Sequence, residues 1–538
     1  MPSTPAPTWR QRIASWLLQA PAPRSGVRAY GGARHSRTTG GFGGSTTSAD
    51  AELHTSLHVL RNRSRQMVRD SAYAKRARDV VVNNVVGPGI GVQAQVVTTR
   101  NGSAKRVNAG IEQAWADWSR AGRCHTGGVL HFADLERMVM LQVFEAGECF
   151  IRLHRQRFGD SAVPLALEVI EPERLADDYH VPAPMQGVDV RMGVEIDGYG
   201  RPLAYWVREG HPGDLRNRAG GAPDQLVRVP AADMLHVRLV ERWPQTRGVP
   251  WLHTVLRKID DVNEYSQHEI TAARASAAYF GTIETPEPAN GLPDAQEDDG
   301  KLVMDIDPLT IQELRPGEKF NFHTPNRPNS AFSEFMRAML REIASGSCTS
   351  YESLSRDYSQ SNYSSSRLAL LDDRDTWRSL QQAFIRSFRE PLHRQWLQAA
   401  VMARSVPGVS VDEYALQPAK FEAVRFKPRG WSWVDPTKEV NAYKEAIKAG
   451  LTTLTDVIAA TGGGVDIEDV IETRRRELDL MAAAGITSDV TFVPEAPAGD
   501  AAAPAATAEP PEPDDDDAED DDGATTDGAR VVPITRTA

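Results

Sequence analysis

Three carboxylates at short spacing are the part of this sequence that most resembles a catalytic or metal site. Glu168, Glu171 and Glu173 could supply the oxygen ligands that hold divalent ions in nucleases. Pro172 stands inside the run, however, and an apolar strand-like segment precedes it. We therefore interpret these carboxylates as the end of a strand that runs into a turn, and we predict no metal site here.

Other motifs of catalysis are absent from the sequence. It contains no G-x-x-x-x-G-K-[ST] loop of ATPase motors, no H-E-x-x-H pair and no G-x-S-x-G elbow. The three cysteines form no C-x-x-C pair, so neither a structural zinc site nor a disulfide scaffold is expected. We interpret Cys149 and Cys348 as packed thiols rather than nucleophiles. The sequence thus predicts neither an enzyme nor a bound cofactor.

Three glycines after a valine-rich run superficially resemble a dinucleotide-binding loop. Gly87, Gly89 and Gly91 follow residues 80–86. A dinucleotide site needs a helix directly after its glycines, because the helix N-terminus holds the pyrophosphate. Residues 92–97 instead alternate apolar and polar side chains, which is typical of a strand. We therefore expect a strand–turn–strand corner and no nucleotide.

The charge of the chain is unevenly distributed. The formal net charge is −12, but residues 494–538 hold 13 acidic and 2 basic side chains, and the other residues together carry only −1. Residues 1–80 are basic, with 13 basic and 4 acidic side chains. The whole-chain charge therefore does not exclude DNA as a partner.

The composition is typical of a soluble globular protein of several parts. Hydrophobic residues make up 41% and charged residues 25% of the chain. No apolar stretch is long enough for a membrane-spanning helix. At about 150 residues per domain, the 538 residues predict three or four structural units.

The N-terminal part of the chain predicts an arm followed by a basic helix. Residues 1–50 are rich in Gly, Ser, Thr, Arg and Pro, with one short helical pattern at residues 9–18. A longer helical pattern covers residues 51–84, and its residues 61–78 carry seven basic side chains against one acid. This pattern is typical of a solvated helix face. The alternative is a surface for a polyanion or an acidic neighbour.

Residues 80–245 predict a mixed α/β domain. Two helices are expected at residues 104–120 and 131–146, the first with Trp115 and Trp118 in the core and the second ended by Gly147. Five strand-like segments follow, at residues 149–153, 165–170, 193–196, 203–207 and 234–239.

Two long helices with an insert between them predict a stalk with a tip. The first runs from Pro250 to about residue 280, and thirty residues would make a rod of about 45 Å. The second starts near Ser330, with apolar residues at i, i+3, i+4 and i+7. The insert, residues 281–327, holds 10 acidic and 4 basic side chains, with strand candidates at 310–314 and 319–322.

The remaining chain is predicted to be mostly helical. Residues 351–366 are dense in Ser and Tyr, and the long helix after them should kink at Pro391. A strand-like segment at residues 431–433 precedes a small helical module, with helices at about 437–449, 455–461 and 467–484. Residues 486–538 predict a disordered acidic tail.

Several stretches, in order from about residue 30 to 485, resemble a known family. They are the glycine-rich arm at 30–44, Asn-Asn-Val-Val-Gly at 83–87, residues 193–205, Pro-Gln-Thr-Arg-Gly-Val-Pro at 244–250, the Ser/Tyr block at 350–367, and residues 435–453. This ordered set resembles the portal proteins of tailed bacteriophages, specifically the lambda-type family. The family pattern commonly has Gly at the position of Pro244.

The resemblance implies a mixed α+β portal fold with a wing, a stem, a clip and a crown. On this sequence it implies an α/β wing at 51–249 after a flexible arm at 1–50. The α-helical stem would be residues 250–280 and 330–347, with the small β-containing clip at 281–329. A tunnel-loop region that returns to the wing would follow at 348–434, then a helical crown at 435–485 and the disordered tail at 486–538.

The resemblance also implies the function and the partners. A homo-oligomeric ring, usually of twelve subunits, would occupy one capsid vertex of the virion after assembly in the host cytoplasm. Double-stranded DNA would be packaged and ejected through it. The implied partners are the terminase large subunit, the major capsid or scaffold protein and a head-completion or adaptor protein, without a membrane. The alternatives are another phage head or neck structural protein, or a packaging nuclease.

Two sets of candidate site residues follow from this comparison. A conduit must not hold DNA tightly, because each phosphate contact adds affinity. The tunnel is therefore expected to be acidic or neutral with few basic side chains, and its candidate DNA-facing residues are Arg337, Arg341, Arg356, Asn362, Tyr363, Ser364 and Arg367. Arg337 and Arg341 could alternatively bridge neighbouring stems. The candidate residues for motor docking at the clip are Glu284, Glu287, Asp294, Asp298, Asp299 and Asp305.

Overall fold

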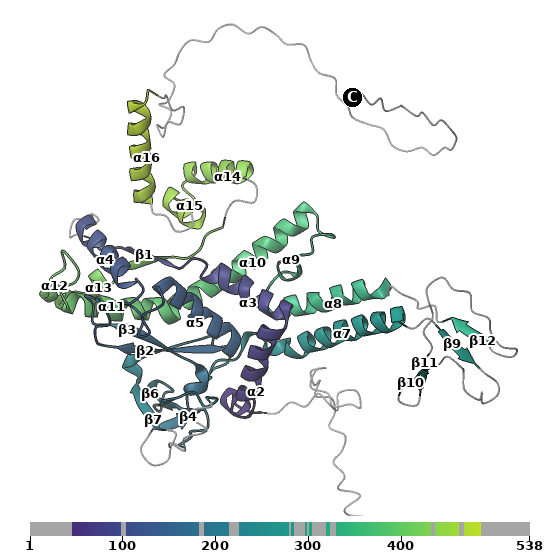
Figure 1. The fold of residues 1–538 in the computed structure, drawn as a ribbon. Helices are drawn as coiled ribbons and strands as arrows, with labels where there is room; N and C mark the ends of the chain where they lie inside the picture. Colours follow the sequence, from purple (N-terminus) through teal and green to yellow (C-terminus); the bar gives the residue numbers. More distant parts are fainter. Residues whose placement is uncertain are drawn as a thin grey trace, which may run out of the picture. The chain divides into compact units, whose positions relative to one another are not determined.

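The computed structural model, drawn in Figure 1, describes most of the chain between residues 46 and 485. The described residues are 46–97, 104–181, 188–214, 225–278, 281–284, 296–298, 301–303, 319–322, 330–431, 436–461 and 467–485. The helix predicted at 9–18, the strand predicted at 310–314, most of the acidic insert and the tail lie outside these residues. By its internal contacts the chain divides into two units, Met1–Val470 and Ile471–Ala538.

The first part of the described chain is a mixed α/β structure, as predicted. Its helices are α2 (Ala49–Asp70), α3 (Ala72–Val85), α4 (Lys105–Trp118) and α5 (Phe132–Ala146). Its strands are β1 (Gly91–Ala94), β2 (Glu148–His154), β3 (Ala166–Ile170), β4 (Asp189–Arg191), β5 (Val194–Ile196), β6 (Pro202–Arg208), β7 (Leu226–Pro230) and β8 (Met234–Arg238). All five predicted strands are present, and β4 and β7 were not predicted.

Strand β2 joins two hydrophobic cores. It is the central strand of an antiparallel sheet in the order β3-β2-β8, and a second antiparallel sheet has the order β4-β5-β6-β7. Because successive side chains of a strand point to opposite faces, Cys149 and Ile151 enter the main core with the helices, whereas Phe150 enters the core of the second sheet. The predicted anchors Trp115 and Trp118 lie in the main core.

The valine-rich segment at 80–86 is helical, which corrects the predicted strand–turn–strand corner. It forms the end of α3, and the side chains of Val80, Val81, Val82 and Val85 are buried. Burial against neighbouring elements outweighs the strand preference of β-branched residues, because propensity is a weak effect. After the turn at the glycines comes β1 and not a helix, so no dinucleotide loop forms.

Strand β1 pairs with a strand from a distant part of the chain. Its partner is β13 (Val424–Lys427), which was not predicted, and the two pair antiparallel from Gly91 opposite Lys427 to Ala94 opposite Val424. This pairing closes the described α/β region with residues that come after the long helices.

The two predicted stalk helices are present and lie side by side in Figure 1. A 3-10 turn, η4 (Trp251–Thr254), precedes α7 (Leu256–Ala278), and the returning helix is α8 (Ser330–Gly346). Lys258 pairs with Glu342 at 3.4 Å, and the Tyr265 ring packs on the rings of Phe332 and Phe335. The 23 residues of α7 span about 35 Å, less than the predicted 45 Å, because the α-helix begins at Leu256 and not at Pro250.

Between α7 and α8 the chain forms two small antiparallel sheets. Strand β9 (Gly281–Glu284) pairs with β12 (Lys319–Phe322), which confirms the strand predicted at 319–322. Strand β10 (Gln296–Asp298) pairs with β11 (Lys301–Val303).

The rest of the described chain is helical except for β13. It comprises α9 (Tyr351–Ser355), α10 (Tyr363–Phe384), a π-helical segment η5 (Ile385–Arg389), α11 (Glu390–Met402), α12 (Val411–Leu416), α13 (Pro418–Phe421), α14 (Pro436–Lys448), α15 (Leu454–Thr461) and α16 (Ile467–Ala483). Pro391 was expected to kink the long helix. A π-helical segment lies just before Pro391, and Pro391 is in the first turn of α11. Among the described helices, none has the length and apolar character that a membrane crossing requires.

Candidate functional site

The loop that leads into α7 is anchored by a fully buried arginine. We call residues 243–249 the stem-root loop. Arg247 in this loop is 0% exposed, and its guanidinium bonds to the equally buried carboxylate of Glu148 at the start of β2, with Nη2–Oε1 2.7 Å and Nε–Oε1 2.8 Å. The other donations go to the carbonyl oxygens of Met192 and Pro172. One side chain thereby connects the root of the stem to both sheets.

Glu148 holds several groups at once. Its Oε2 accepts from the backbone N–H of Gly248 at 2.8 Å and from His236 at 2.8 Å, and Arg61 of α2 lies 3.5 Å from Oε1. Burial alone would raise the pKa of Glu148, but Arg247, His236 and Arg61 hold that pKa well below its usual range. Burial, aided by Arg238, lowers the pKa of His236 to about 3, so its imidazole is neutral.

The residues on either side of Arg247, Thr246 and Gly248, are also held in place by close contacts. The carboxylate of Asp50 accepts from both the N–H and the hydroxyl of Thr246, each at 2.7 Å. Gly248 crosses Gly147 so closely that a Cβ added at Gly248 would lie 2.2 Å from the Gly147 carbonyl oxygen. The sequence motif at 244–250 therefore joins the start of α7 closely to both sheets, and a larger residue than glycine does not fit at this crossing.

The basic face predicted on the first helices meets acidic neighbours rather than solvent. Arg61 is buried against Glu148, and Arg65 forms a bidentate pair with Glu173 at 2.9 and 3.0 Å. Arg78 pairs with Glu145 at 2.8 Å. The solvated-face interpretation is wrong for these three residues, and the acidic neighbours lie in the same chain.

The Ser/Tyr block after α8 forms two helices, α9 and the start of α10, that side-chain hydrogen bonds hold together. Asp373 of α10 is buried, and its carboxylate accepts from the N–H and hydroxyl of Ser350, at 2.8 and 2.6 Å, and from the hydroxyl of Ser353 at 3.0 Å. Burial raises the pKa of Asp373. Because Ser350 is also the N-cap of α9, this one carboxylate holds α9 against α10.

Three of the predicted tunnel residues lie around α9. The guanidinium of Arg341 stacks on the ring of Tyr351, 5.5 Å from its centroid. Hydrogen bonds from Ser359 and Tyr351, together with the charge of Arg337, lower the pKa of Asp357 to about 2. Arg356 ends α9 in the left-handed conformation, with φ of 58°. The structure thus brings the three arginines to one turn of the chain.

The other predicted tunnel residues lie at the start of α10. Asn362 caps the helix in a capping box with Ser365, and Ser364 is exposed. Tyr363 is the first residue of the helix, and Arg367 lies 3.7 Å from Glu439 of α14. Asn362 and Arg367 therefore have structural contacts within the chain, which the sequence patterns did not reveal.

The predicted clip residues fall mostly outside the described part of the chain. Glu284 is the last residue of β9 and Asp298 the last of β10. Glu287, Asp294, Asp299 and Asp305 lie outside the described residues. Their part in docking stays a prediction.

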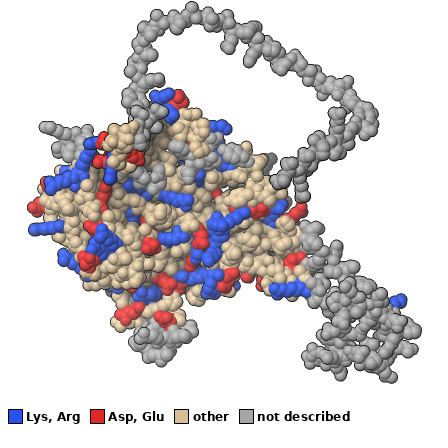
Figure 2. Space-filling model, turned by 45° about the horizontal axis from the view of Figure 1, so that its top comes forward, with Lys and Arg blue, Asp and Glu red and all other residues tan. Residues whose placement is uncertain are grey.

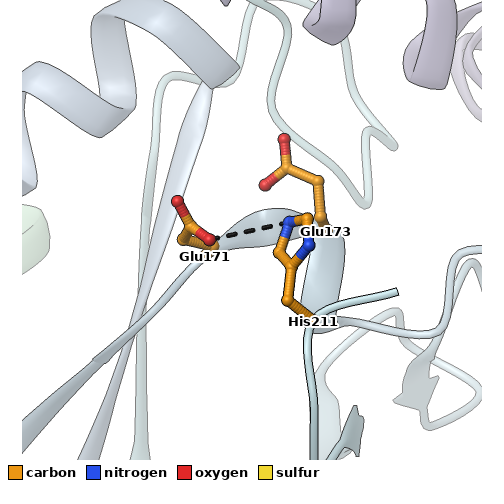
Figure 3. A group of neighbouring side chains, drawn as sticks. All are labelled: Glu171, Glu173 and His211. Carbon is orange, nitrogen blue, oxygen red and sulfur yellow. Dashed lines mark ion pairs between the residues drawn. The ribbon is translucent and has the colours of Figure 1, made fainter. Parts of the chain in front are cut away.

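The carboxylates with which the sequence analysis began do not form a nuclease centre. Glu168 pairs with His154 at 2.8 Å and with Arg174 at 3.1 Å. Glu171, Glu173 and His211 do come together, as Figure 3 shows, with His211 3.6 Å from Glu171. Arg65 occupies this cluster, however, since it binds Glu173 and lies 3.8 Å from Glu171. The turn after β3 is as predicted, and the guanidinium already fills the place of a cation.

The cysteines bear out only part of the prediction. Cys149 is fully buried, and burial raises its pKa, so it is a packed thiol. Cys348 is exposed in the turn after α8, which corrects the prediction that it is packed.

On the face seen in Figure 2, basic and acidic side chains of the described residues are intermingled, consistent with a nearly neutral body.

Comparison with known proteins gives the chain its family. The model of the family described as "Phage portal protein, lambda family" matches residues 35–381. The probable portal protein of Halomonas phage phiHAP-1 is 28% identical over 445 residues, which cover 80% of this chain and 82% of that protein. Portal protein B of Escherichia phage lambda is 24% identical over 518 residues, covering 87% and 93%. A chain from the neck of a native gene transfer agent particle is similar at 14% identity, with a TM-score of 0.38 and coverage of 74% and 93%.

The family match includes the junction and the α9–α10 turn whose geometry is described above. Portal proteins are ring-forming structural components of the phage head, through which DNA is packaged and to which the tail is connected, and they are not enzymes. The chain belongs to the lambda family of phage portal proteins, and it is a portal subunit of a virion.

Proposed function

We propose that twelve copies of this chain form the portal ring and that each copy contributes α7 and α8 to the channel wall. The observation that carries this proposal is the locked base of the helix pair. Arg247 and Glu148 fix the start of α7, and the Trp251 indole donates to the Ser347 carbonyl at the end of α8, at 2.9 Å. A pair of helices held at its root by the wing is suited to a channel wall that must bear passing DNA.

The domain assignments follow the same plan. The wing is 51–249, the stem is 250–280 with 330–347, and the clip is 281–329. The tunnel-loop region is 348–434, and the crown is 435–485. The two small sheets β9–β12 and β10–β11 support a compact tip between the stem helices, and the acidic residues of segment 281–329 give it the charge to dock the terminase large subunit and later a head-completion protein. The wing would contact the major capsid or scaffold protein during assembly in the host cytoplasm.

The DNA-facing role of the α9 region is the second part of the proposal. Arg337, Arg341 and Arg356 gather at the turn around α9, and Ser364 is exposed at the start of α10. A few arginines among hydroxyl groups would touch DNA phosphates without holding them, since affinity rises with every phosphate neutralised. Arg341 on Tyr351 would in addition keep the turn in place.

The ring is tested by electron microscopy of the purified chain. Rings with a central hole as wide as a DNA duplex support the proposal, and monomers or sheets contradict it.

The DNA contact is tested in an assembly reaction with the Arg337→Glu/Arg341→Glu double variant. A changed length of packaged DNA is expected. The matched control is Arg378→Glu, because Arg378 is exposed on α10 and pairs only with Asp375, three residues away, among described carboxylates. Unchanged DNA length in the double variant would refute the contact.

A further inference from the structure

A pocket of about 400 Å³ lies between the second sheet and the stem-root loop. Its volume is in the range of pockets that bind small ligands or single side chains of a partner. The lining combines strand residues of β4–β6 with residues that flank Arg247, among them Arg191, Tyr205, Arg238, Trp243 and Gln245. Neither the stem nor the tunnel candidates take part in it, so the pocket is independent of the proposed channel.

Arg238 brings to this pocket a positive charge that no described carboxylate pairs directly. Glu148 is shared by Arg247 and Arg61, and Asp50 binds Arg191 and Thr246. Arg238 contacts instead the neutral ring of His236, at 2.6 Å, and the carbonyl oxygen of Gln245, at 3.3 Å. Among described residues, no carboxylate lies within ion-pair distance of Arg238. A largely buried cation is stable only when an anion or water pairs with it.

A second polar group faces the same space. Tyr205 lines the pocket and is only 2% exposed, and no described residue forms a hydrogen bond with its hydroxyl. Burial raises the pKa of Tyr205 to about 12, so the hydroxyl keeps its proton and can donate it. An acceptor bound in the pocket would give this hydroxyl a hydrogen-bond partner.

Aromatic rings stand at the rim of the pocket. Trp243 is 70% exposed and Tyr199 is 83% exposed, and both line the pocket. The Trp243 ring lies against Gly200, where a Cβ would be 3.6 Å from it, and Arg201 stacks on the Tyr199 ring. Exposed Trp and Tyr beside an arginine are the residue types that dominate binding energy at interfaces. They would cover an apolar group attached to the anion.

We propose that this pocket binds a carboxylate carried on a small apolar skeleton, with the Arg238 guanidinium and the Tyr205 hydroxyl on the carboxylate and with Trp243 and Tyr199 on the skeleton. The carboxylate could belong to an Asp or Glu side chain of a partner or to a free small acid. A phosphate fits less well, because the carboxylates of Asp189 and Asp197 also line the pocket and repel a dianion more strongly.

The test is titration of the purified full-length protein, followed by calorimetry and Trp fluorescence. The free-acid probe is 3-phenylpropionate, and the side-chain probe is the blocked peptide acetyl-Pro-Glu-Pro-amide. The controls are 3-phenylpropionamide, the matching glutamine peptide and inorganic phosphate. Binding of either carboxylate at least about tenfold tighter than its amide supports the proposal, since a hydrogen bond to a charged group has that effect. The tighter of the two probes identifies the source.

Variants decide whether binding occurs in this pocket. Tyr205→Phe removes only the hydroxyl and should weaken the carboxylate probes about tenfold and the neutral amides less, because a hydrogen bond to a charged acceptor is the stronger one. Arg238→Gln should weaken binding of the carboxylate probes further. If the Arg238→Gln protein does not fold, Tyr205→Phe and Trp243→Ala test the proposal in its place, and each should weaken binding of the carboxylate probes. The matched control is Arg242→Gln, because Arg242 directly precedes Trp243 in the chain but pairs with Glu52 and does not line the pocket. Equal binding of acids and amides, tighter binding of phosphate, or no effect of Tyr205→Phe would overturn the proposal.

Discussion

Replacement of Glu148 by glutamine should destabilise the protein more than any exposed charge change. Glu148 is 0% exposed and has Arg247 at 2.7 Å, His236 at 2.8 Å and Arg61 at 3.5 Å. Glu148→Gln keeps the size of the side chain but leaves two buried guanidinium groups without their shared anion. Removal of one partner of a buried ion pair costs about 3–5 kcal/mol. We therefore expect the free energy of unfolding to fall by about that amount.

Urea unfolding at pH 7, followed by Trp fluorescence, measures this loss. The matched control is Glu342→Gln, because Glu342 pairs with Lys258 on the stem and both side chains are about half exposed. Exposed pairs of this kind contribute only about 0–1 kcal/mol. A loss below about 1 kcal/mol in Glu148→Gln, equal to that of the control, would refute the view that this carboxylate fixes the start of α7 to strand β2.

Three further predictions concern other buried contacts. Burial lowers the pKa of His393 to about 3, so the unfolded chain takes up a proton first as pH falls below 6.5, and stability is lost between pH 6.5 and 3. His393→Leu should lose about 3 kcal/mol less than the parent between pH 7 and 4.5 in urea unfolding, and equal losses would contradict this. Gly248→Ala should cost about 3 kcal/mol, because its Cβ would meet the Gly147 carbonyl, and an unchanged melting temperature would disprove that crossing. Asp373→Ala should leave the Ser350 N–H unpaired and remove the bonds of the Ser350 and Ser353 hydroxyls to α10, costing about 2 kcal/mol. It should also speed hydrogen exchange at residues 350–355, and unchanged exchange would count against the α9–α10 link.

The helices and strands were predictable where a local pattern coincides with burial. The apolar spacing after Ser330 predicted α8, and the alternation at 203–207 predicted β6, because in both elements one face packs and the other does not. Two predictions overlapped at residues 80–84. The helical pattern of 51–84 was right there, whereas the strand preference of the valines was wrong, because the helices packed around them decide the outcome.

Contacts between distant residues could not be predicted from the sequence. Strand β13 is short, and only its partner β1, over 300 residues earlier, makes it a strand. Arg61 belongs to a basic run that suggested solvent, and its burial depends on Glu148 lying 87 positions away. Arg247 was noted only as part of the motif at 244–250, because spacing along the chain does not reveal that it reaches Glu148, Met192 and Pro172.

The same limit applies to the candidate sites. The Ser/Tyr block was recognised, but the capping role of Asn362 and the carboxylate of Asp373 that joins α9 to α10 depend on geometry. Likewise, no motif marks Arg238 and Tyr205, which meet only when β6 and β8 are brought to the stem-root loop.

The central claim is that this chain assembles into a portal ring, and the mass of the purified particle tests it most directly. Twelve subunits of 59.1 kDa predict a species of about 710 kDa in native mass spectrometry or mass photometry. The Glu148→Gln variant should give less of this species than Glu342→Gln, because the stem is then no longer fixed to the wing. A wild-type chain that remains a 59.1 kDa monomer at all concentrations would contradict the account.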